Sequence, residues 1–150
     1  SMRSQSPLSL AFMDIDNFKS INDNHGHEAG DHVLMDVAEI IRAGLRTGDM
    51  LVRWGGEEFI LIMPNTYCAD AVRAMERLRE KGFGTRPDGA RVTASIGLSE
   101  RIEDQAADWR QLVEIADRRM YLAKQSGKDR LVSADDVDQC CKVSDRRTRQ

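Results

Sequence analysis

Two short apolar runs, separated by a four-residue polar segment, constrain the fold of this chain more than any other feature. The runs are MLVRW (residues 50–54) and FILIM (residues 59–63), and the segment between them reads GGEE. Runs of this length are typical of strands, and a short glycine-containing connection is typical of a β-hairpin. Because tight hairpin turns require positive φ, we expect the two glycines to supply it. The chain must therefore contain antiparallel strands.

The remaining apolar periodicity predicts further strands and helices. Strands are expected at residues 8–15, 91–98 and 130–133, and helices at residues 31–46, 67–82 and 108–127. The strand at 91–98 alternates apolar and small polar residues, which predicts burial of one face only. The last helix carries an apolar stripe made of Trp109, Leu112, Val113, Ala116, Met120 and Ala123. The order β-α-β-β-α-β-α-β predicts an α/β fold whose central sheet is mixed, mostly antiparallel and flanked by helices.

Composition narrows the class of protein. The chain has 150 residues, 41% of them apolar and 31% charged, with a net charge of −3. These values are typical of one globular domain and argue against a nucleic-acid partner.

Cys68, Cys140 and Cys141 have neither disulfide-framework nor zinc-site spacing, so we expect reduced thiols and a cytoplasmic location, although a longer parent protein could be membrane-anchored. We expect the domain to end near residue 133, and the charged tail at 134–150 to be frayed or loosely helical.

Three acids are candidates for a metal site. Asp14 ends the first predicted strand, while Glu57 and Glu58 occupy the hairpin connection. If that strand lies beside the hairpin, the carboxylates meet, and like charges ~4 Å apart repel by ~4 kcal/mol at an effective dielectric of about 20. A hard divalent cation such as Mg²⁺ removes this repulsion, and the Ile15 carbonyl is a plausible further ligand. Alternatively, the glutamates are solvated turn residues and Asp14 caps the turn that follows it.

Groups that suit a nucleotide are also present, although the usual Gly-rich phosphate loops are absent. Lys19, Lys124 and Lys128 are candidates for phosphate contacts, with the last two expected on one face of the last helix. Alternatively, these two lysines could interact favourably with the dipole at the C-terminal end of that helix. Asn22 and Asp31 could bind the edge of a guanine, but Asp31 is also the best N-cap for the helix predicted to follow it.

These segments together resemble the GGDEF family, the diguanylate cyclases. The matching stretches are MDIDNFKSINDNHGHEAGDHVL, RTGDMLVRWGGEEFILIMP, VTASIGLS and ADRRMYLAKQSGKDR, in the family's order over residues 8–132. GGEEF is an accepted variant of the family signature. The resemblance implies a palm-like nucleotidyl-cyclase fold and the condensation of two GTP into cyclic di-3′,5′-GMP and two pyrophosphates. It also implies an antiparallel homodimer, because each subunit holds one GTP.

The resemblance assigns the metal and the chemistry by position. Asp14, the Ile15 carbonyl and Glu57 would bind Mg²⁺ (or Mn²⁺), with Glu58 as an added ligand. Glu57 would also accept the proton of the ribose 3′-hydroxyl. Lys19 would stabilise charge on the transferring phosphate. This is the pattern of metal-assisted phosphoryl transfer.

The resemblance assigns the nucleotide contacts as well. Asn22 and Asp31 would recognise guanine, His27 would lie close to the nucleotide, and Lys124 and Lys128 would hold the β and γ phosphates. A carboxylate at position 31 favours GTP over ATP, because N1 of adenine carries no hydrogen and cannot donate a hydrogen bond to the carboxylate.

A second ligand site is implied by RTGD, residues 46–49, which matches the family's RxxD inhibitory site. Arg46 and Asp49 would bind the product, cyclic di-GMP, and Arg77 would complete the site from the neighbouring subunit. An arginine can stack on guanine or bind phosphate, and an aspartate can accept from a guanine edge. Taken alone, RTGD could equally be a helix end with solvated charges.

The chain departs from the family at its start. Seven residues precede the first strand, where the family has a helix and a D-x-L-T-G-L-x-N-R segment. We therefore expect this fragment to lack its N-terminal helix and its upstream regulatory domain. The alternative to an enzyme is a catalytically weak receptor that binds cyclic di-GMP. A purely structural dimerisation domain would explain none of the acids.

Overall fold

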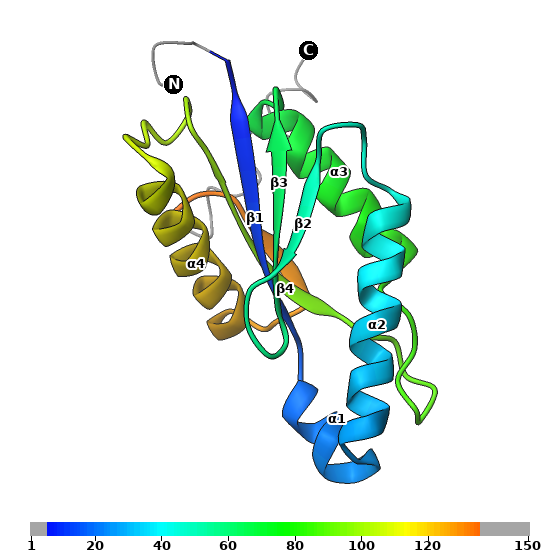
Figure 1. Cartoon of the computed structure of the whole chain (residues 1–150). Coiled ribbons are helices and arrows are strands. Elements are labelled where there is room, and N and C mark those ends of the chain that lie inside the picture. Colours follow the sequence, from blue (N-terminus) through cyan, green and yellow to red (C-terminus); the bar gives the residue numbers. More distant parts are fainter. Residues whose placement is uncertain (1–5, 136–150) are drawn as a thin grey trace.

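The computed structural model describes residues 6–135, in which one sheet lies between two layers of helices (Figure 1). The strands are β1 (Leu8–Ile15), β2 (Met50–Arg53), β3 (Glu58–Pro64), β4 (Ala94–Glu100) and β5 (Arg130–Val132). They lie in the order β2-β3-β1-β4-β5, and only β4 and β5 pair in parallel. The predicted hairpin and the mixed, mostly antiparallel sheet are confirmed.

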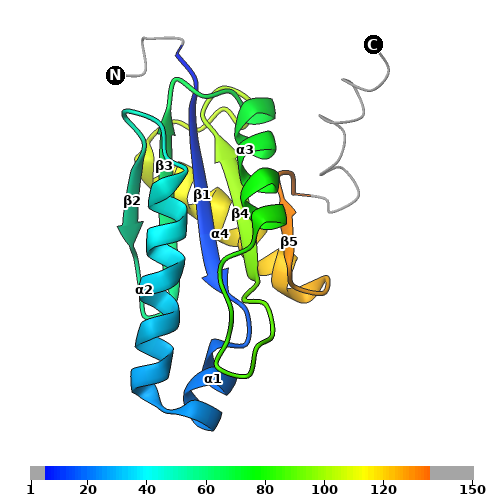
Figure 2. The same ribbon diagram turned by 90° about the vertical axis from the view of Figure 1, so that its right-hand side faces the viewer.

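The helices are α1 (Phe18–His25), α2 (His27–Ala43), α3 (Cys68–Lys81) and α4 (Trp109–Gln125). Figure 2 shows α2 and α3 in front of the sheet and α4 behind it, with α1 below the end of β1. The helix α1 was not predicted, because its eight residues, FKSINDNH, contain only two buried apolar side chains, Phe18 and Ile21. No helix within residues 6–135 is long and apolar enough to cross a bilayer.

The central strand β1 supplies side chains to both cores. Ala11, Met13 and Ile15 belong to the core under α1, α2 and α3, whereas Leu10 and Phe12 belong to the core under α4. This alternation follows from the two-residue period of a strand. Because both faces are covered, the polar groups at the end of β1 enter the protein interior.

The prediction that β4 buries one face only is wrong. All seven residues of β4 are buried, because α4 covers the face that carries the small residues. Its hydroxyls are satisfied inside the protein: Ser95 Oγ donates to Asp16 Oδ1 at 2.6 Å, and Ser99 Oγ donates to the Leu112 carbonyl at 2.8 Å. Polar residues on this strand therefore mark internal hydrogen bonds and not a solvent face.

Glycine at position 97 lets α4 lie directly on β4. A Cβ at this position would lie 2.0 Å from the Ala116 carbonyl oxygen and 2.2 Å from the Met120 nitrogen, which are both backbone atoms. Most of the predicted apolar stripe of α4 does face the sheet, but Trp109 is 46% exposed, so its assignment to the stripe is wrong.

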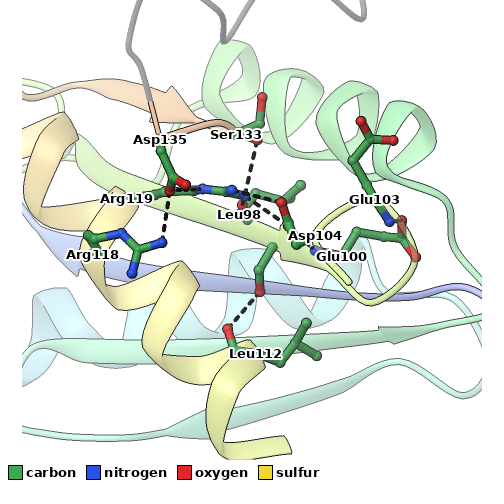
Figure 3. A network of polar contacts seen from close by, with 10 residues as sticks. Leu98, Glu100, Glu103, Asp104, Leu112, Arg118, Arg119, Ser133 and Asp135 are labelled. Carbon is green, nitrogen blue, oxygen red and sulfur yellow. Dashed lines mark hydrogen bonds and ion pairs between the residues drawn. The ribbon is translucent and has the colours of Figure 1, made fainter. Parts of the chain in front are cut away.

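A buried arginine of α4, Arg119, links this helix to the loop that follows β4 (Figure 3). Arg119 forms two hydrogen bonds with the Asp104 carboxylate, at 2.9 and 2.7 Å. Its guanidinium also donates to the carbonyls of Leu98 and Ser133 and to the carboxylate of Asp135. Nearby, the backbone N–H groups of residues 102 and 103 donate to the carboxylate of Glu100. The charges of Arg119, Asp104 and Glu100 are thus matched by partners on the chain.

The hairpin glycines do not adopt the positive φ that was expected of them. Within the turn, the N–H groups of Trp54 and Gly55 both donate to the Glu58 carbonyl. A Cβ on Gly55 would lie 2.7 Å from Glu58 Oε1, whereas nothing lies within 4 Å of one on Gly56. A side chain at position 55 would therefore displace the carboxylate of Glu58 from its present position.

Candidate active site

The end of β1 lies against the hairpin, which is the condition under which the sequence predicts that the three acids meet. Asp14 is the register partner of Glu58 on β3, and the Ile15 N–H donates to the Glu57 carbonyl at 3.2 Å. The backbone pairing that builds the sheet therefore brings the three acids to one edge.

Burial makes these acids unfavourable as anions. Burial raises the pKa of Asp14, an effect that the ammonium of Lys124 opposes and the carboxylate of Asp16 reinforces. Burial also raises the pKa of Glu57 and of Glu58, and the charge of Asp14 raises both further. Asp14 Oδ1 is inaccessible to solvent, and its charge is met by the ammonium of Lys124, whose Nζ lies 2.8 Å away. The cluster therefore carries more negative charge than its surroundings neutralise.

The donor set fits a hard divalent cation, since carboxylate and carbonyl oxygens are its preferred ligands. The raised pKa values of the three carboxylates support this fit, because a bound cation would offset their mutual repulsion. Within residues 6–135, however, no three His, Cys, Asp or Glu side chains are gathered in an arrangement ready to hold an ion. The acids are thus of the right type and close together, but their side chains would have to converge around a cation.

The predicted lysines lie beside these acids. Lys19, Lys124 and Lys128 line a cavity of about 460 Å³ together with Glu57 and the start of α1. Lys19 Nζ also contacts Asp23 at 2.8 Å. The prediction that Lys124 and Lys128 share a helix face is wrong: α4 ends at Gln125, and Lys128 follows in a turn with a φ of 65°.

The predicted guanine contacts lie outside the described wall of this cavity. Asn22 is on α1, and its Oδ1 is buried without a hydrogen-bond partner. A Cβ on Gly30 would lie 1.9 Å from that oxygen, so α1 and α2 meet closely here. His27 and Asp31 are exposed on α2. The prediction that Asp31 caps a helix is wrong, because α2 begins four residues earlier at His27, with Gly26 as its N-cap.

The RTGD residues belong to a second cavity, of about 670 Å³, between α2, α3 and the sheet. Arg46 and Asp49 line it, and Asp49 Oδ2 accepts a hydrogen bond from the Arg46 N–H at 3.0 Å. Arg46 also donates to Thr66 Oγ1 at 2.6 Å. Arg77 lines the same cavity within this one chain, although it was expected to reach the site from a neighbouring subunit.

Sequence reasoning missed Asp16, a buried acid next to Ile15. Its carboxylate accepts hydrogen bonds from Thr93 Oγ1 at 2.7 Å, Ser95 Oγ at 2.6 Å and the Asp129 N–H at 2.9 Å. It therefore joins the end of β1 to β4 and to the turn that follows α4. The available signal was its spacing of two from Asp14, but nothing local identified its distant donors.

Comparisons with known proteins agree with this arrangement. The family model described as "Diguanylate cyclase, GGDEF domain" matches residues 1–130. Diguanylate cyclase A of Treponema denticola is 42% identical over 128 residues, which cover 83% of this chain and 34% of that protein. The chain spans 21% to 34% of the length of the curated relatives it matches.

Solved structures with the same fold include two cyclase domains. The active GGEEF domain of a diguanylate cyclase from Vibrio cholerae has a TM-score of 0.79 at 31% identity, covering 87% of this chain and 84% of that one. The GGDEF domain of DgcB from Caulobacter crescentus, in complex with c-di-GMP, has a TM-score of 0.76 at 30% identity, covering 87% and 80%. This chain therefore belongs to the GGDEF domain family of diguanylate cyclases.

Proposed function

We propose that this domain condenses two molecules of GTP into cyclic di-3′,5′-GMP. Each ribose 3′-hydroxyl attacks the α-phosphate of the other nucleotide, loses its proton and displaces pyrophosphate, so that two new ester bonds replace two phosphoanhydride bonds. The observation that carries this proposal is the under-neutralised cluster of Asp14, Glu57 and Glu58 beside a lysine-lined cavity. Family membership supports the same reaction.

Catalysis in this family depends on a metal, and we assign Mg²⁺ or Mn²⁺ to the acid cluster. Asp14, the Ile15 carbonyl, Glu57 and Glu58 would hold it. A divalent cation there would withdraw electrons from the α-phosphate and favour ionisation of a ribose hydroxyl. Glu57 is the proton acceptor in this scheme.

The lysines hold the phosphates in this proposal. Lys19 stabilises the transferring phosphate, and Lys124 and Lys128 bind the β and γ phosphates. In the structure, Lys124 neutralises Asp14. A divalent cation bound to Asp14 would take over this role, and the Lys124 ammonium could then contact the phosphates of a nucleotide in the cavity that Lys124 lines.

Asn22 and Asp31 recognise the base, with His27 close by. The buried Oδ1 of Asn22 lacks a partner, and the exposed Asp31 carboxylate is accessible to a base. A carboxylate accepts two hydrogen bonds from the N1–H and N2–H₂ edge of guanine, which adenine lacks. This supports GTP as the substrate.

A homodimer is required by the reaction, because each subunit holds one GTP and a ring needs two. The product would bind as an inhibitor at the cavity formed by Arg46, Asp49 and Arg77. The size of that cavity and its pairing of cations with an aspartate support a nucleotide ligand.

The test is turnover of GTP with Mg²⁺ at high protein concentration, followed by chromatography of the products. We expect cyclic di-GMP from the wild type, and a loss of about hundredfold or more in Glu57→Gln. Equal rates in the two proteins would contradict the assignment of Glu57. Binding of cyclic di-GMP without turnover, lost in Arg46→Ala, would instead identify a receptor.

A further inference from the structure

The turn after α4, which carries Lys128, has an unusual backbone. Gly127, Lys128 and Asp129 have φ values of 130°, 65° and 47°. Side chains other than glycine rarely adopt positive φ, and such conformations persist only where the surroundings enforce them. A Cβ at Gly127 would also lie 2.5 Å from a guanidinium nitrogen of Arg130. The Lys128 N–H donates to the Ala123 carbonyl at 2.9 Å, which holds the start of the turn against α4.

Two residues from distant elements form hydrogen bonds with Asp129, which lies in this turn. Its N–H donates to Asp16 Oδ2 at 2.9 Å. Its carbonyl accepts from Arg79 Nη2, and its carboxylate accepts from the same nitrogen at 3.2 Å. The two peptide groups on either side of the Asp129 Cα are thus held, one by an acid next to the end of β1 and the other by an arginine from α3.

Asp16 and Arg79 are each held by further contacts. Asp16 is 3% exposed, and hydroxyls of Thr93 and Ser95 hold its carboxylate. Arg79 forms an ion pair with Glu76 one turn earlier on α3. The sheet and α3 therefore add to the local hydrogen bond between the Lys128 N–H and the Ala123 carbonyl in fixing the position of the turn.

The consequence is the placement of one ammonium group. Lys128 Nζ donates to Asn17 Oδ1 at 2.8 Å, and its side chain lines the cavity shared with Lys19 and Lys124. A lysine on a loose turn would have to be ordered when ligand binds, which lowers affinity. We propose that Asp16 and Arg79 are positioning residues that hold the Lys128 ammonium in place for the terminal phosphates of the nucleotide. This inference rests on the proposed function, because it takes Lys128 as a phosphate ligand.

The test is a double-mutant cycle in the full chain, with a non-hydrolysable GTP analogue and Mg²⁺ measured by calorimetry. We expect Arg79→Ala to weaken binding about tenfold, the scale of one charged hydrogen bond, and to raise KM more than it lowers kcat. In a Lys128→Ala background the same change should have little further effect, since it acts through Lys128. The matched control is Arg118→Ala, an exposed arginine of α4 paired with Asp135, which should leave affinity unchanged.

A second pair of variants guards against simple misfolding. Asp16→Asn keeps an oxygen for Asp129 and Thr93, and the Ser95 hydroxyl can rotate to accept from the new amide. We therefore expect Asp16→Asn to retain affinity within a few-fold and Asp16→Ala to lose about tenfold. Nuclear magnetic resonance of the Lys128 side chain should show it ordered in the wild type and mobile in Arg79→Ala, independently of activity.

The outcomes distinguish a failure of the positioning role from a failure of the proposed function. Independent, multiplicative losses in Arg79→Ala and Lys128→Ala would overturn the positioning role, as would unchanged affinity in Arg79→Ala while Lys128→Ala binds weakly. If the wild type fails to bind, or if Lys128→Ala and Glu57→Gln leave both binding and turnover intact, the proposed function fails and this inference fails with it.

Discussion

Charged side chains cluster at both ends of the central strands, but they are satisfied to very different degrees. Near the start of β1, the strand pairing places Ser9 opposite Glu100, and there Arg119, Asp104 and Glu100 have partners for their charges. Near the end of β1, Asp14 has the ammonium of Lys124 as a partner, but Asp14, Glu57 and Glu58 still repel one another, and all three have raised pKa values. The difference separates the two uses of buried charge: a satisfied network fixes the fold, whereas an unsatisfied one is left for a ligand.

The largest expected effect tests the satisfied end. Arg119→Ala would leave Asp104 as a buried acid without its partner and would remove donors from two carbonyls. We expect a loss of about 3–5 kcal/mol in the free energy of unfolding, measured with urea. The exposed pair of Arg118 and Asp135 is the control, where Arg118→Ala should change stability by no more than about 1 kcal/mol. Equal losses of stability in Arg119→Ala and Arg118→Ala would contradict a structural role for the contacts of Arg119.

The next prediction tests the unsatisfied end, where stability and activity should move differently. Asp14→Asn removes a buried charge whose pKa burial raises. We expect turnover to fall by about hundredfold or more, while the free energy of unfolding without divalent ions stays the same or increases. Urea unfolding and product formation, measured on the same preparation, check this. A destabilised variant would mean that Asp14 contributes to the fold as Asp104 does.

The smallest expected effect is on the pH dependence of stability, which should have opposite signs at the two ends. Asp14, Glu57 and Glu58 have folded-state pKa values above their ordinary values of 3.8 and 4.5. As pH falls through the raised values, proton uptake favours the folded state, so their contribution to stability increases until the ordinary values are passed. Hydrogen bonding by Arg118 lowers the pKa of Asp135, so its contribution is lost as pH falls through the lowered value.

Urea unfolding over a pH series without divalent ions checks this sign. Replacing all three acids by their amides should abolish the gain on acidification, and Asp135→Asn should leave that gain in place. Saturating Mg²⁺ should also suppress it, since a bound cation favours the ionised carboxylates. A wild type and a triple variant with the same pH profile would contradict the assignment of the gain to these acids.

The sequence was sufficient for features that depend on local pattern and strand pairing. The hairpin and the mixed, mostly antiparallel sheet follow from short apolar runs and their connections, and the sequence also identified the condition under which Asp14 meets Glu58. It was insufficient where a distant partner decides. Ser95 appears solvent-facing in the sequence, because its acceptor, Asp16, lies 79 residues away.

The candidate site divides in the same way. Residue types identified the acids and lysines, and the structure gathers Lys19, Glu57, Lys124 and Lys128 around one cavity. The residues that fix their positions were not identifiable, because Arg79 and Asp129 are 50 positions apart. Asp31 was misplaced as a cap because no apolar periodicity marks the first turn of α2.

The close approach at Gly97 limits how this domain can be controlled. Backbone meets backbone between β4 and α4 with no side chain between them, so the helix cannot slide across the strand without steric collision. The backbone of Lys124 and of Arg119 belongs to that helix and therefore moves together with the sheet. We therefore expect an incoming signal to alter how often two whole domains come face to face, and to leave the interior shape of each one unchanged.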